Sequence, residues 1–67
     1  MDSSVIASMG YDAIQRVLEL EFRETGRLYD YFDVPPEEYA EFLAAPSKGT
    51  YLNQIFKLRG YRNVRVK

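Results

Sequence analysis

Residues 16–23 read RVLELEFR, in which apolar and charged side chains alternate. Leu18, Leu20 and Phe22 point to one side of an extended chain, and the intervening residues point to the other side. This period of two is typical of a half-buried β-strand with one solvated face. The loop 24–26 follows, and its glycine can take the left-handed conformation that a tight hairpin needs. The stretch therefore predicts a strand that turns directly into a hairpin.

Two further strands are predicted beside this one. The earlier strand has Val5, Ala7, Met9 and Tyr11 on one side and Ile6 and Ser8 on the other, and turn residues follow over 10–15. The later strand runs from Arg27 to about Val34. One of its faces holds Leu28, Asp30, Phe32 and Val34, and the other holds Arg27, Tyr29, Tyr31 and Asp33. A register shift of one residue would exchange these faces, so the pattern does not decide which of the two faces the helices cover.

Two helices are predicted after Pro35-Pro36, which ends the strand pairing. The first runs from about Pro36 to Ala45, with an apolar stripe of Tyr39, Phe42 and Leu43. The second has Ser47 as its N-cap, reaches about Leu58 and stops at Gly60. Its expected buried side is Tyr51, Leu52, Ile55, Phe56 and Leu58. Residues 61–67 form either a short edge strand or a basic tail.

These elements predict an α+β fold in a single domain over residues 1–67. The expected architecture is a three-stranded antiparallel meander followed by two helices packed on one face, with a possible short C-terminal strand. A chain of 67 residues buries only about 60% of the surface that its unfolded form exposes, so one small core is expected.

The composition excludes several kinds of chemistry. The chain has no Cys and no His, which excludes disulfides, thiolate metal sites, a Cys nucleophile and imidazole ligands. No nucleophile–base pair stands out, so we expect no catalysis, no cofactor and no metal. No apolar run is long enough for a membrane helix, and residues 1–10 lack a signal-peptide pattern. We therefore expect a cytoplasmic protein.

The net charge of −1 hides an uneven distribution. Residues 1–47 hold all ten acids and three arginines, a net charge of −7, whereas residues 48–67 hold six cations and no acid. Such a split suggests either a charged partner or pairing between the two ends of the chain.

Two stretches resemble the KTSC domain. Residues 29–35, YDYFDVP, are similar to the Tyr-x-Tyr centre and Val-Pro of that family, and residues 45–53, APSKGTYLN, to its Ser-x-Gly-x-Tyr-x-Asn stretch. The start, from Ser4 to Asp12, and the strand 18–22 fit as well, whereas the basic last seven residues depart from the pattern. KTSC domains are short bacterial modules that also occur at the C-terminus of some lysyl-tRNA synthetases. The resemblance implies RNA binding.

The basic C-terminal end is the first candidate site. Its cations are interleaved with Tyr51, Phe56 and Tyr61, a composition that suits a phosphate backbone and unstacked bases. The predicted nucleic-acid-binding cations are Lys48, Lys57, Arg59, Arg62, Arg65 and Lys67. The alternative is a solvated face that pairs with acids from the first half, with the aromatic residues in the core.

Tyr29 and Tyr31 are the second candidate. They share a strand face beside Arg27, so their rings can form a stacking platform for RNA bases. The alternative is that the helices cover this face and the rings are core. We expect at least one of the two tyrosines to be core.

Ser47, Lys48 and Gly49 are the third candidate, an anion seat at the start of the second helix. Ordinary helix capping is the favoured alternative.

The leading functional hypothesis is a module that binds RNA or single-stranded nucleic acid. The alternative is a protein-interaction or self-associating module, in which an exposed strand edge and the acidic face contact a partner.

Overall fold

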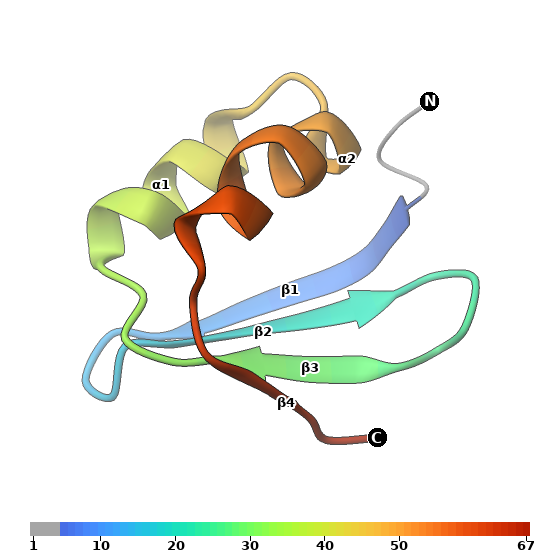
Figure 1. The fold of residues 1–67 in the computed structure, drawn as a ribbon, viewed down its shortest axis with the longest axis horizontal. Coiled ribbons are helices and arrows are strands. Elements are labelled where there is room, and N and C mark those ends of the chain that lie inside the picture. Colours follow the sequence, from blue (N-terminus) through green and yellow to red (C-terminus); the bar gives the residue numbers. More distant parts are fainter. Residues whose placement is uncertain (1–4) are drawn as a thin grey trace.

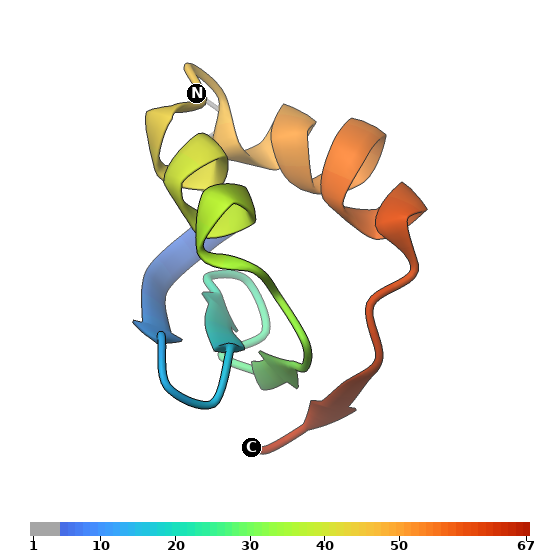
Figure 2. The same cartoon turned by 90° about the vertical axis from the view of Figure 1, so that its left-hand side faces the viewer.

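The computed structural model describes residues 5–67, which form a four-stranded antiparallel sheet with the helices on one face (Figures 1 and 2). The strands lie in the order in which they occur along the chain. They are β1 (Ile6–Asp12), β2 (Val17–Phe22), β3 (Leu28–Tyr31) and β4 (Asn63–Arg65). The helical segments between β3 and β4 are α1 (Pro36–Ala44), α2 (Lys48–Tyr51), η2 (Leu52–Phe56) and η3 (Lys57–Arg59). The predicted α+β class is confirmed.

The C-terminal segment is an edge strand and not a free tail. Its pairing with β3 extends beyond the bounds of β4, because the amide of Phe32 donates to the carbonyl of Arg62 at 2.8 Å and the amide of Leu28 to that of Lys67 at 3.1 Å. The chain thus descends from the end of the helices and returns to the sheet beside β3 (Figure 2).

The core face of the sheet carries the two tyrosines of β3. Leu18 and Leu20 are fully buried, and they lie opposite Tyr31 and Tyr29 respectively. Residues directly opposite in a sheet share a face, so both tyrosines point toward the helices. Tyr31 is buried and Tyr29 is half-buried, which confirms the expectation that at least one of them is core.

Val34 was predicted on the face opposite these tyrosines, and this is wrong, because its side chain is fully buried in the same core. The strand ends at Tyr31, and Asp33 takes a left-handed conformation with φ of 59°. The turn at Asp33 breaks the alternation and brings Val34 back to the core side.

The faces predicted for the first strand are also partly wrong. The pairing of β1 with β2 shifts between Ile6 and Ser8, so the strand has a bulge there. Ile6 therefore shares the core face with Met9 and Tyr11, whereas Ala7 is exposed. Val5 is exposed as well, and Ser4 lies outside the described residues.

The helices bury only part of the apolar stripes that the sequence predicts. Leu43, Ile55 and Leu58 are exposed, at 47%, 39% and 79%. The second helical segment passes from an α-helical turn into a π-helical turn and then a 3₁₀ turn, and the wider π turn brings Phe56 to the core after Tyr51. In α1, Glu38 takes the place on the core side that the pattern assigned to Leu43.

Candidate binding groove

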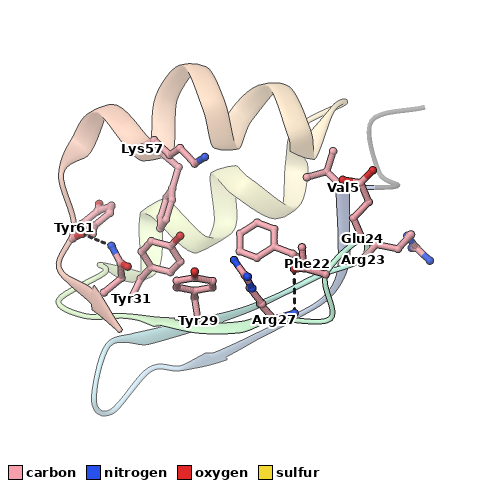
Figure 3. Close-up of a pocket in the computed structure, with 12 residues that line it drawn as sticks. Val5, Phe22, Arg23, Glu24, Arg27, Tyr29, Tyr31, Lys57 and Tyr61 are labelled. Carbon is pink, nitrogen blue, oxygen red and sulfur yellow. Dashed lines mark hydrogen bonds between the residues drawn. The ribbon is translucent and has the colours of Figure 1, made fainter. Parts of the chain in front are cut away.

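A groove of about 740 Å³ opens between the sheet and the second helical segment (Figure 3). The end of β2, the β2–β3 hairpin and β3 form its floor, η2 and η3 overhang it, and the chain leading into β4 closes one end. Its volume lies in the range of about 300–1,000 Å³ that is usual for small-molecule sites. Its aromatic lining consists of Phe22, Tyr29, Tyr31, Phe56 and Tyr61.

These five rings form two contacting groups along the groove. Phe22 meets Tyr29 edge to face with 5.6 Å between the ring centroids. Tyr31 meets Phe56 at 4.9 Å, and Phe56 meets Tyr61 at 5.0 Å. Such contacts hold the rings in fixed positions, so the aromatic surface exists before any ligand arrives.

The hydroxyls of Tyr29 and Tyr31 make no hydrogen bond to another of residues 5–67, and neither oxygen is shut off from solvent. Tyr31 is only 8% exposed, and burial, followed by the proximity of Tyr29, raises the pKa of its phenol. A tyrosine hydroxyl in a folded protein usually finds a partner. The hydroxyls of Tyr51 and Tyr61 do so, because both donate to Glu38. The groove therefore contains polar groups that a ligand can satisfy.

Three cations and one acid accompany the rings. Lys57 comes from the helical side, whereas Arg27 and Arg23 come from the β2–β3 hairpin together with Glu24 (Figure 3). The groove thus combines aromatic surface with a net positive charge, in a protein whose net charge is −1. This combination suits a ligand that carries both a ring and an anionic group.

Of the predicted nucleic-acid-binding residues, the groove brings together Tyr29, Tyr31 and Lys57. The other cations lie outside its lining. Lys48 donates to the carbonyl of Leu43 at 3.1 Å, and the Arg62 guanidinium lies 5.0 Å from the ring centroid of Phe32. Arg65 donates through Nε to the carbonyl of Lys67, and Arg59 pairs with Glu38.

The predicted anion seat contains an ordinary helix cap. Ser47 Oγ accepts a hydrogen bond from the amide of Thr50 at 3.1 Å, which is the capping interpretation. Gly49 is buried beside it in the first turn.

The groove includes residues that the sequence analysis did not select. Phe22 received no binding role, Tyr61 appeared only among the aromatic residues interleaved with the basic end, and Arg27 only as a neighbour of the tyrosine pair. The inward face of the second strand was the available signal for Phe22, because Phe22 continues the series of Leu18 and Leu20. No local pattern shows that Tyr61 returns to the sheet.

A buried carboxylate supports one end of the groove. Glu38 is 5% exposed and accepts hydrogen bonds from Tyr51 and, at 2.9 Å, from Tyr61, while Arg59 Nε lies 2.8 Å from its Oε1. Burial and then the hydrogen bond to Glu38 raise the pKa of Tyr51 and of Tyr61 to about 12. Glu38 thereby ties α1 to the ring of Tyr61, which lines the groove.

Within residues 5–67, no three Asp or Glu side chains gather in a way that would hold a metal ion. None of the helices described there is long and apolar enough to cross a membrane.

The KTSC domain family model matches residues 2–61 of this sequence. The chain belongs to the KTSC domain family. A crystal structure of a KTSC domain protein from Yersinia pestis is 36% identical and superposes with a TM-score of 0.88, covering 100% of this chain and 92% of that one. The resemblance in residues 29–35 and 45–53 is confirmed at the level of the family.

Relatives of this KTSC chain include both short and long proteins. A protein of Stutzerimonas stutzeri is 46% identical over 66 residues, which cover 98% of this chain and 92% of the relative. The lysine–tRNA ligase of Nostoc punctiforme is 38% identical over 56 residues, which cover 84% of this chain but 10% of the ligase. The KTSC module thus occurs as most of a short protein and as a small part of a long one.

Proposed function

We propose that this KTSC domain is a non-catalytic module that binds RNA or other single-stranded nucleic acid in the groove between β3 and η3. The observation that carries the proposal is the meeting of three half-buried rings, Phe22, Tyr29 and Tyr61, with three cations in one groove. Aromatic side chains stack on bases with about 1–3 kcal/mol per base, and lysine and arginine attract phosphates regardless of sequence.

The relatives support this proposal. Lysine–tRNA ligases of Nostoc punctiforme, a second Nostoc strain and Trichormus variabilis contain a segment similar to this chain. A module joined to a ligase that acts on tRNA would lie near RNA whenever the ligase binds its tRNA. The cations outside the groove would then add attraction that is independent of sequence; they are Lys48, Arg59, Arg62, Arg65 and Lys67.

The test is fluorescence anisotropy with a labelled single-stranded RNA of ten nucleotides at 50 mM salt. The double variant Arg27→Gln/Lys57→Gln should bind at least about tenfold more weakly, and its affinity should depend less steeply on salt. The matched control is Lys48→Gln/Arg62→Gln, which removes the same charge outside the groove lining and should change the affinity less than about threefold.

Two results would contradict the proposal. One is the absence of RNA binding by the folded wild-type protein at 50 mM salt. The other is an equal loss in both double variants, because this would place binding in the total charge and not in the groove.

The outer face of the sheet supports a second candidate, a protein-interaction or self-associating module. The helices leave this face uncovered, and it carries Glu19, Glu21 and Asp30 beside Val64 and Val66, which are 49% and 52% exposed. Sizing at 50 mM and 500 mM salt separates the candidates, since an apolar dimer contact persists at high salt whereas RNA binding weakens.

A further inference from the structure

We propose that the groove reads one nucleotide unit, with the hydroxyls of Tyr29 and Tyr31 on the polar edge of its base and Arg27 and Lys57 on its phosphate. This inference rests on the proposed function and narrows the ligand from a strand to a single nucleotide within it. The same chemistry would also hold a free nucleoside monophosphate.

The dimensions of the groove favour a short ligand. Its volume of about 740 Å³ is that of a small-molecule site, and the chain leading into β4 closes one end. Two of the basic residues beyond the groove do not extend it into a track, because Arg59 is paired with Glu38 and Lys48 is bound to the end of α1. A long strand would therefore meet the groove at one or two of its nucleotides.

The unpartnered hydroxyls favour a ligand with a polar edge. Packing against Phe56 and Phe22 needs only the rings of Tyr31 and Tyr29, and phenylalanine would supply the same rings. A phenol both donates and accepts a hydrogen bond, and the edges of nucleobases present donors and acceptors side by side. A base in the groove would give both hydroxyls the partners that they lack among the described residues.

The charges are placed for a phosphate beside the base. Lys57 approaches the groove from η3 and Arg27 from the residue before β3, and the two tyrosines project from β3 beside them (Figure 3). An anion bound between the two cations would bring an attached ring over the tyrosines. In this arrangement the cations bind the phosphate and the hydroxyls bind the edge of the base.

The experiment is a titration of the ¹⁵N-labelled protein, followed by amide NMR shifts, with the four nucleoside 5′-monophosphates. Uridine and adenosine test the need for the phosphate, and ribose 5-phosphate and inorganic phosphate test the need for the base. The variants are Tyr29→Phe and Tyr31→Phe. The matched control is Tyr39→Phe, whose ring stacks on Tyr11 outside the groove lining.

We expect shifts at residues lining the groove, and binding of ribose 5-phosphate at least about tenfold weaker than that of nucleotides. Loss of one neutral hydrogen bond should weaken the affinity of Tyr31→Phe about 2- to 10-fold and change the order of preference among the bases. Its stability should stay close to that of the wild type, since the hydroxyl has no partner among residues 5–67 to lose. Tyr39→Phe should keep both the affinity and the base preference.

The inference would be overturned if Tyr29→Phe/Tyr31→Phe kept the wild-type affinity and base preference, or if ribose 5-phosphate bound as tightly as the nucleotides. RNA binding that mononucleotides neither compete with nor reproduce in the groove would overturn the inference and leave the proposed function standing. Groove binding of mononucleotides without RNA binding would uphold the nucleotide site and overturn the proposed function.

Discussion

Replacement of Glu38 by alanine should strongly destabilise the protein. The variant leaves the hydroxyl of Tyr51, a residue 7% exposed, without its main acceptor, and removes the acceptor of Tyr61 and the partner of Arg59. A hydrogen bond to a charged group contributes about 1.5–3 kcal/mol when buried, and a half-exposed ion pair adds about 0–1 kcal/mol. With a smaller contribution from half-buried Tyr61, the expected loss is about 3–4 kcal/mol.

This loss is large for so small a domain. A stability of about 0.05–0.15 kcal/mol per residue predicts a free energy of unfolding of about 3–10 kcal/mol for the whole chain. Urea unfolding followed by far-ultraviolet circular dichroism measures the difference between the variant and the wild type.

Glu37→Ala is the matched control for this experiment. Glu37 lies in the same first turn of α1 but is exposed. Its removal therefore changes the charge at the helix end and leaves Glu38 and its hydrogen-bond partners intact. We expect a change of less than about 0.5 kcal/mol. The double variant Glu38→Ala/Tyr51→Phe should recover about 1 kcal/mol, because it no longer buries an unpartnered hydroxyl.

Equal stability of Glu38→Ala and Glu37→Ala would refute this reasoning. It would mean that the hydrogen bonds to Glu38 only balance the cost of burying its charge, as happens for some buried ion pairs.

Three further predictions follow from local features. Between about pH 10 and about pH 12, folded Tyr51 and Tyr61 keep protons that the unfolded chain loses, so the free energy of unfolding should fall as the pH rises, and less steeply in Tyr51→Phe. The hydrogen bond to Asp30 raises the pKa of Glu19, which means that the charged form of Glu19 is disfavoured beside that carboxyl group. Glu19→Gln should therefore raise the free energy of unfolding by about 0.2–1 kcal/mol at pH 7, and this gain should vanish at acidic pH, where Glu19 is protonated. Glu21→Gln, opposite Leu28, is the control. Gly60→Ala, at φ of 76° with open space around the added Cβ, should lose about 1–2 kcal/mol from backbone strain alone in thermal unfolding.

The sequence predicts the order of the elements well because most of the fold is local. The alternation in residues 16–23 fixes β2, and the prolines and the Ser47 cap delimit the helices. Departures from regular periods caused the errors. The bulge after Ile6 reverses a strand face, the left-handed Asp33 returns Val34 to the core, and the π turn exposes Ile55. Each depends on tertiary packing, which a periodic pattern does not contain.

The candidate groove depends even more on tertiary structure. Tyr29 and Tyr31 are marked by their alternation, but they meet Lys57 and Tyr61 only after the chain returns to the edge of the sheet as β4. Glu38 is the clearest case. A glutamate in the first turn of a helix is ordinary surface usage, and only the convergence of Tyr51, Tyr61 and Arg59 makes its burial tolerable.

The two faces of the sheet differ in charge, and this has a consequence for how an anion first meets the protein. Glu19, Glu21 and Asp30 lie on the outer face, whereas Arg27 and Lys57 lie on the helix side. With a net charge of −1, the molecule as a whole exerts only a weak electrostatic force on a distant anion. Within the Debye length of about 8 Å in physiological salt, the charges near the point of contact decide the interaction instead. An anion that approaches the outer face is then repelled by its carboxylates, whereas one that approaches the groove is attracted by Arg27 and Lys57. The protein therefore favours one direction of approach before any base is stacked.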